Sequence, residues 1–72
     1  MLKSIYRAEY KRIVEDLRKA REGASLRAED VAQKFNKPQS YVSKIERGER
    51  CIDIVELKAF ARLYQKPLDY FI

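Results

Sequence analysis

Apolar residues recur every three or four positions along nearly the whole chain, and this spacing limits the possible folds more than any other feature of the sequence. It places apolar side chains on one face of an α-helix. No segment alternates apolar and polar residues as a half-buried β-strand does. Because 72 residues provide for one hydrophobic core and not two, we expect a single all-α domain over residues 1–72.

Residues that end helices divide this pattern into segments. Gly23 suits the left-handed conformation that follows many helices, Asn36 tolerates that conformation better than most residues, and Gly48 is expected to end the third helix. The expected helices cover residues 5–22, 27–35 and 38–47, followed by a fourth helix capped by Asp53 and a last turn at residues 68–71. The second and third of these helices are separated by only a few residues, which predicts a tight turn between them.

The chain is basic, with a formal net charge of +5 from 16 Lys and Arg against 11 Asp and Glu. Residues 51–72 carry three bases and three acids, so the excess lies in the first two thirds of the chain. A basic front with a neutral tail suggests a polyanionic partner for one part of the molecule. A general solubilising charge explains the total equally well.

The counts of cysteine and histidine exclude several classes of protein. Cys51 is the sole cysteine and histidine is absent, so neither an internal disulfide framework nor a zinc-ligand cluster is expected. No nucleophile, carboxylate dyad or glycine-rich phosphate loop stands out, and we expect neither an enzyme nor a cofactor.

No apolar run approaches the roughly 18 residues that span a bilayer, which indicates a cytoplasmic protein without a membrane partner. Cys51 is either passive or a redox or metal sensor.

The third expected helix carries the most informative surface. At about 100° per residue, one sector of this helix holds only polar or basic side chains, namely Gln39, Ser40, Ser43, Lys44 and Arg47. An ordinary solvated face usually includes Asp or Glu, whereas this sector has none. Its side chains are the types that bond base edges and phosphates in the major groove. The sector therefore favours a helix that contacts DNA.

The segment Leu26–Gly48 resembles the helix-turn-helix of the phage repressor and Cro superfamily, also called the xenobiotic response element family. The resemblance extends from about Val14 to Phe71, and its motifs are the pair Val31-Ala32, the tight turn and the run Ser43-Lys44-Ile45-Glu46-Arg47-Gly48. It implies a compact five-helix lambda-repressor-like fold with the helix-turn-helix at the second and third helices. It also implies a sequence-specific transcriptional regulator, most simply a repressor, whose third helix lies in the major groove of double-stranded DNA.

Position by position, the resemblance assigns roles in DNA binding. The implied base-reading residues are Gln39, Ser40 and Lys44, and the implied backbone or groove contacts are Arg27, Tyr41, Ser43, Arg47 and Arg50. Tyr41 has an equal alternative role, which is to pack the third helix on the second. Arg27 and Ala28 stand where the family commonly has Ser or Thr followed by Gln, so operator sequences of relatives do not transfer to this chain.

The resemblance also pairs Glu46 with an arginine near the end of the first helix, which is Arg21 in this sequence. A shielded bidentate pair would lock the third helix against the first. A loose surface pair, the alternative, would contribute little.

We expect the protein to bind DNA as a symmetric homodimer, because one helix reads too few base pairs to compete with non-specific sites. The neutral C-terminal third is the expected interface, since the basic front would repel a second copy. Its apolar candidates are Ile52, Ile54, Val55, Tyr70, Phe71 and Ile72. The alternative is that they complete the monomer core.

The alternative to a DNA-binding regulator is an antitoxin or protein-interaction module built on the same scaffold.

Overall fold

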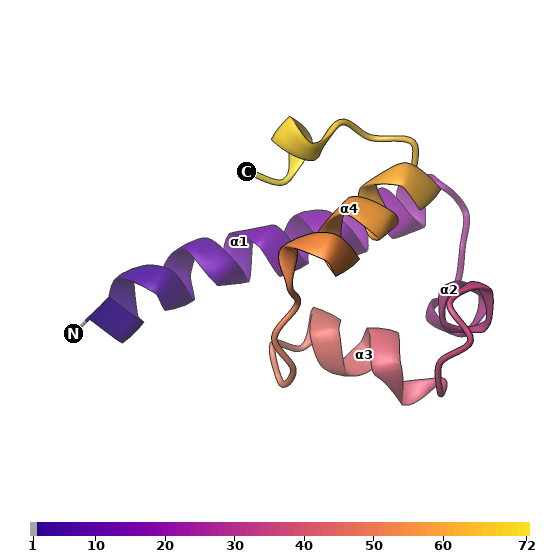
Figure 1. The fold of residues 1–72 in the computed structure, drawn as a ribbon, viewed down its shortest axis with the longest axis horizontal. Coiled ribbons are helices and arrows are strands. Elements are labelled where there is room, and N and C mark those ends of the chain that lie inside the picture. The colour runs from indigo at the N-terminus through magenta and orange to yellow at the C-terminus, as the bar shows by residue number, and fades with distance from the viewer. Residues whose placement is uncertain (1) are drawn as a thin grey trace.

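The computed structural model describes the backbone of residues 2–72 and the side chains of residues 8–72. Its elements are α1 (Leu2–Gly23), α2 (Ala28–Lys34), α3 (Ser40–Glu46), α4 (Ile54–Leu63) and the 3-10 helix η1 (Leu68–Tyr70) (Figure 1). This part of the chain contains no β-strand, so the prediction of an all-α fold is confirmed. The expected count of five α-helices is not confirmed, because the fifth element is a single 3-10 turn.

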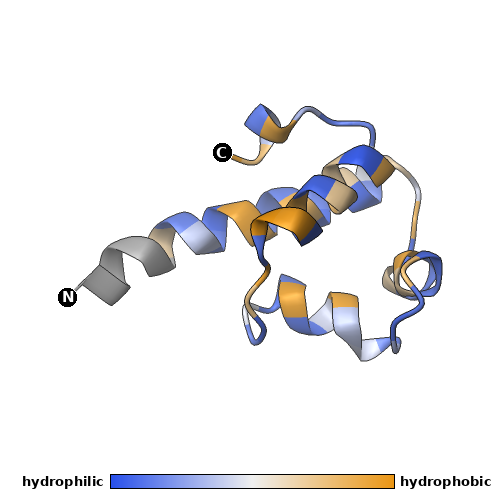
Figure 2. Ribbon diagram, in the orientation of Figure 1, coloured by the Kyte–Doolittle hydropathy of each residue, from blue (hydrophilic) through white to orange (hydrophobic). Residues whose placement is uncertain are grey.

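The long helix α1 is the support on which the other elements are arranged. α4 crosses its C-terminal half, α2 and α3 lie to one side of that half, and the N-terminal turns of α1 extend beyond them (Figure 1). Figure 2 shows hydrophobic and hydrophilic residues along both α3 and α4, and the buried residues of each helix recur at spacings of three or four. Both helices are therefore amphipathic, with one face available to the core and one to solvent.

All four α-helices end through the same arrangement. A residue in the left-handed conformation follows each helix, and these residues are Ser25, Asn36, Gly48 and Gln65. The next amide donates to the carbonyl five residues earlier, as in the bond of 2.8 Å from Glu49 N to Lys44 O. The predictions for Asn36 and Gly48 are confirmed. The prediction for Gly23 is wrong, because Gly23 is the last residue of α1 and Ser25 makes the turn instead.

The start of α4 agrees with the predicted Asp53 cap, whereas α3 starts later than predicted. The Asp53 carboxylate accepts from the Glu56 amide at 2.7 Å, and the Glu56 carboxylate accepts from the Asp53 amide at 3.1 Å. This reciprocal pair satisfies two backbone donors at the start of α4. α3 begins at Ser40 and not at residue 38, so Gln39 is the residue that precedes the helix.

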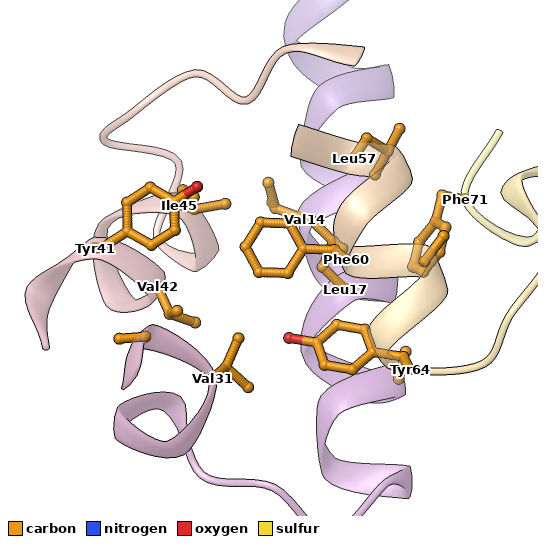
Figure 3. Packing of buried hydrophobic residues seen from close by; sticks show 13 residues of the cluster. Val14, Leu17, Val31, Tyr41, Val42, Ile45, Leu57, Phe60, Tyr64 and Phe71 are labelled. Carbon is orange, nitrogen blue, oxygen red and sulfur yellow. The ribbon is translucent and has the colours of Figure 1, made fainter. Parts of the chain in front are cut away.

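One hydrophobic core joins all the elements around Phe60 of α4. Tyr41 of α3 and Val31 of α2 point toward Phe60 and Tyr64 (Figure 3). The Phe35 ring meets the Phe60 ring edge-on at a centroid distance of 4.8 Å. The other buried members are Val14, Leu17, Ala20, Ala32, Val42, Ile45, Leu57, Ala61 and Phe71. Because α1, α2, α3 and α4 all contribute, the orientation of α3 is set by the same core that stabilises the fold.

The structure corrects the assignment of Phe71 to a dimer interface. The Phe71 side chain is only 2 % exposed and packs into the monomer core after η1. Ile52 is half-buried and also packs against this core. A short chain buries a small fraction of its surface and therefore needs such side chains internally. The remaining candidates, Ile54, Val55, Tyr70 and Ile72, are exposed.

Candidate nucleic-acid interface

The outer face of α3 is the polar surface on which the candidate site is built. Gln39, Ser40, Lys44 and Arg47 are exposed and Ser43 is half-buried. We call these five residues the α3 strip. The opposite face of α3 is buried in the core through Tyr41, Val42 and Ile45. The α3 strip is thus a continuous hydrogen-bonding surface. The helix that carries it is held rigidly, because every apolar residue of α3 packs into the core.

The turn between α2 and α3 is short and closed by backbone bonds. Lys37 N donates to Ala32 O at 2.9 Å, and Tyr41 N donates to Pro38 O at 2.9 Å. Phe35, the residue that ends α2, packs edge-on against Tyr41 at a centroid distance of 6.5 Å. These contacts fix the angle between the two helices, as the tight turn in the sequence predicts.

A bidentate ion pair connects the end of α3 to α1. Arg21 Nε donates to Glu46 Oε2 at 2.8 Å and Arg21 Nη2 donates to Glu46 Oε1 at 3.1 Å. Arg21 Nη1 also donates to the Leu26 carbonyl at 2.9 Å, so one guanidinium joins α1, the α1–α2 turn and α3. The Arg21 and Glu46 side chains are 14 % and 10 % exposed. The hydrogen bonds that Arg21 donates to Glu46 raise the pKa of Arg21 above its ordinary value.

A second polar tie connects the start of α3 to α4. The Tyr41 hydroxyl donates to Glu56 Oε2 at 2.8 Å, and Arg50 Nη1 donates to Glu56 Oε1 at 3.2 Å. The Arg50 guanidinium also lies over the Tyr41 ring, 4.9 Å from its centroid. Burial and the bond to Glu56 raise the pKa of Tyr41 to about 12. Burial acts to raise the pKa of Glu56, but its bonds from Arg50, the Asp53 amide and Tyr41 hold that pKa below the ordinary value.

Sequence reasoning missed Glu56 as the residue that holds Tyr41 and Arg50. The spacing of Asp53 and Glu56 carries a signal for a capping box, but not for a contact with a tyrosine fifteen positions earlier. Tyr10 was missed too, since the apolar stripe of α1 indicates only a packing role. Its hydroxyl donates to the Arg50 carbonyl at 2.7 Å and so ties the loop after α3 to α1.

Four of the predicted backbone contacts, Arg27, Tyr41, Arg47 and Arg50, already have partners within the chain. Arg27 lies at the start of α2 with its side chain 75 % exposed, 3.6 Å from Asp30. Arg47 lies on the strip itself and pairs with Glu49, with Nε and Oε2 3.0 Å apart. Tyr41 and Arg50 both have internal partners, so their contact with a phosphate would compete with Glu56.

The comparison with known protein families agrees with this geometry. Residues 17–71 match the model of a helix-turn-helix family, and the chain therefore belongs to the helix-turn-helix family of phage repressor and Cro type. The resemblance predicted from the sequence is confirmed. Proteins of this family are DNA-binding transcription regulators and are generally not enzymes. No curated protein and no solved structure matches the chain.

The match begins inside α1, so residues 2–16 of that helix lie outside the segment shared with the family model. Within the described residues, no cluster of acidic, cysteine or histidine side chains is placed to hold a metal ion. None of the described helices is both long and apolar enough to cross a membrane.

Proposed function

We propose that the protein binds double-stranded DNA sequence-specifically by placing α3 in the major groove, and that it acts as a repressor in the cytoplasm. The observation that supports this proposal is the α3 strip, a surface of five polar or basic side chains without an acid, four of them exposed and Ser43 half-buried. Gln39, Ser40 and Lys44 read base edges in this proposal, because their side chains are exposed on the outer face of α3. Arg27, Ser43 and Arg47 contact the DNA backbone. Tyr41 donates to a phosphate only by leaving Glu56, because its hydroxyl has one proton.

Selection of binders from a random duplex library, followed by competition binding at a fixed salt concentration, tests the base-reading role. We expect Gln39→Ala and Lys44→Ala each to cost about 1–3 kcal/mol at the preferred site and to relax the preference at one position. Lys58→Ala, which changes an exposed cation on α4, is the control and should leave the preference unchanged. Full discrimination by either α3 variant would contradict its assignment. Absence of any salt-dependent duplex binding would instead favour the antitoxin or protein-interaction function.

We also propose that the DNA-bound form is a symmetric dimer. Ile54 and Val55 at the start of α4 are 54 % and 72 % exposed, and Tyr70 and Ile72 at the C-terminus are 40 % and 72 % exposed. Exposed apolar side chains in a charge-neutral segment suit contact with a second copy. The operator is then an inverted repeat with half-site centres about 34 Å apart.

Sedimentation of the free and DNA-bound protein tests the dimer. The expected result is two copies on the inverted repeat and a loss of this stoichiometry in Val55→Lys. The control Glu29→Lys introduces a cation at an exposed position outside the neutral segment and should leave the stoichiometry unchanged. A monomer that binds one half-site with full affinity would overturn the proposal.

A further inference from the structure

A hollow of about 470 Å³ lies between α1 and the end of α3. Lys11, Glu15 and Arg18 line it from α1, and Arg47 and Gly48 line it from the α3 side. Arg47 is also the last residue of the α3 strip, so the hollow is continuous with the proposed DNA-reading surface. Most of its α1 side precedes the segment shared with the family model. The hollow is therefore lined largely by a part of α1 that lies outside the segment matched by the family model.

Some charged side chains around this hollow form ion pairs and others do not. Lys11 and Arg18 are seven residues apart and lie in one stripe of α1, two turns from each other. Both are exposed, and among residues 8–72 neither has a carboxylate within ion-pair distance. Glu15 lines the same hollow without pairing with either cation. Glu46, which also lines it, is already neutralised by Arg21 at 2.8 Å.

The backbone at the end of α3 leaves room for a neighbouring chain. Gly48 follows α3 with a φ of +76°, and an added Cβ there would meet no atom within 4 Å. The space beside Arg47 is thus open, with unpaired cations on the opposite wall. A helix in the major groove has a sugar-phosphate backbone at each side, and cations on the walls of a hollow attract such a polyanion.

We propose that α1 makes a second contact with DNA, in which Lys11 and Arg18 bind phosphates of the strand that passes the end of α3. The contact rests on the proposed DNA binding by α3. It carries no base specificity, because the two cations meet the backbone only. It therefore raises the affinity for every sequence and extends the region of DNA that the protein covers along one strand.

The chain offers a charge-matched control for this proposal. Arg12 and Lys19 each follow one of the proposed residues, are exposed, and are also seven residues apart on α1. Since successive helical residues differ by about 100°, this pair lies on another stripe of the same helix. Arg12 lines a different hollow, next to Phe71, and Lys19 lines one next to Tyr64. One double variant combines Lys11→Gln and Arg18→Gln. The control double variant combines Arg12→Gln and Lys19→Gln, and it changes the net charge by the same amount.

The experiment measures the dissociation constant of each protein on the selected duplex and on an arbitrary duplex as a function of salt. Two lost phosphate contacts reduce the slope of log affinity against log salt by about 1.8. Over a fourfold rise in salt, wild type should then lose about tenfold more affinity than the Lys11, Arg18 variant, on both duplexes. The Arg12, Lys19 variant should retain the wild-type slope. Circular dichroism of all three proteins checks that α1 is intact.

Phosphate ethylation interference locates the contact. We expect one or two phosphates beside the half-site to interfere with wild type and with the control variant, but not with the Lys11, Arg18 variant. Equal slopes for the two double variants, or an unchanged slope for the Lys11, Arg18 variant, would overturn the second contact while leaving DNA binding by α3 intact. Wild-type protein that shows no salt-dependent duplex binding would overturn the proposed function itself.

Discussion

Loss of the pair between Arg21 and Glu46 should destabilise the fold by far more than loss of an ordinary surface pair. Both side chains are at least 86 % buried, because they are 14 % and 10 % exposed, and two short hydrogen bonds join them. In the variant Glu46→Gln the guanidinium keeps its bond to the Leu26 carbonyl but loses its counter-charge. In Arg21→Met the Glu46 carboxylate is left without either donor.

The loss of unfolding free energy in each single variant lies between two limits. Hydrogen bonds to charged groups contribute about 1.5–3 kcal/mol each, and breaking a fully buried pair costs about 3–5 kcal/mol. Residual exposure of both groups reduces these costs, so we expect about 2–3 kcal/mol for each single variant. At roughly 0.05–0.15 kcal/mol per residue, a domain of this size has a total stability of about 4–11 kcal/mol. Each single change should therefore remove a large part of the free energy of unfolding.

A double-mutant cycle in urea measures the coupling between the two residues. The double variant Arg21→Met with Glu46→Gln should cost less than the sum of the single variants by about 1–2 kcal/mol. Arg47 and Glu49 provide the matched control, because this pair has a comparable separation of 3.0 Å but side chains that are 58 % and 55 % exposed. Its coupling should be at most about 1 kcal/mol. Equal coupling in the two cycles would refute the argument that shielding makes the Arg21 pair strong.

Two further predictions concern the hydroxyl groups of Tyr64 and Tyr41. The Tyr64 hydroxyl is buried without a hydrogen-bond partner among the described residues, so Tyr64→Phe should leave the free energy of unfolding unchanged or raise it by up to about 1 kcal/mol. A loss of more than about 1 kcal/mol in urea denaturation would show that this hydroxyl is satisfied. The pKa of Tyr41 is raised from 10.0 to about 12, so the folded chain keeps a proton that the unfolded chain loses. Its contribution to stability is present below about pH 10 and is lost as the pH rises through about 12. Tyr41→Phe should weaken this alkaline loss in urea titrations, and an unchanged pH dependence would contradict the assignment.

Much of the fold could be predicted from the sequence because it depends on neighbouring residues. Apolar spacing of three and four defines the helices, and the residue types at Asn36 and Gly48 indicate two of the four left-handed turns. The α3 strip follows from the same periodicity, since a helix that buries Tyr41, Val42 and Ile45 must expose the other side. The Arg21–Glu46 pair could be proposed only from the family resemblance, because 25 residues separate its members.

Tertiary structure decided which side chains have partners and which remain free. Phe71 and Ile72 are both apolar and adjacent, yet packing after η1 buries the first and leaves the second 72 % exposed. Arg47 and Arg50 both follow α3, but Arg47 pairs with the exposed Glu49, whereas Arg50 turns to Glu56 and the Tyr41 ring. Such outcomes depend on segments far apart in the chain, as in the bond between Tyr10 and the Arg50 carbonyl across 40 positions. Local periodicity cannot encode these contacts, because they exist only once α1, α3 and α4 share one core.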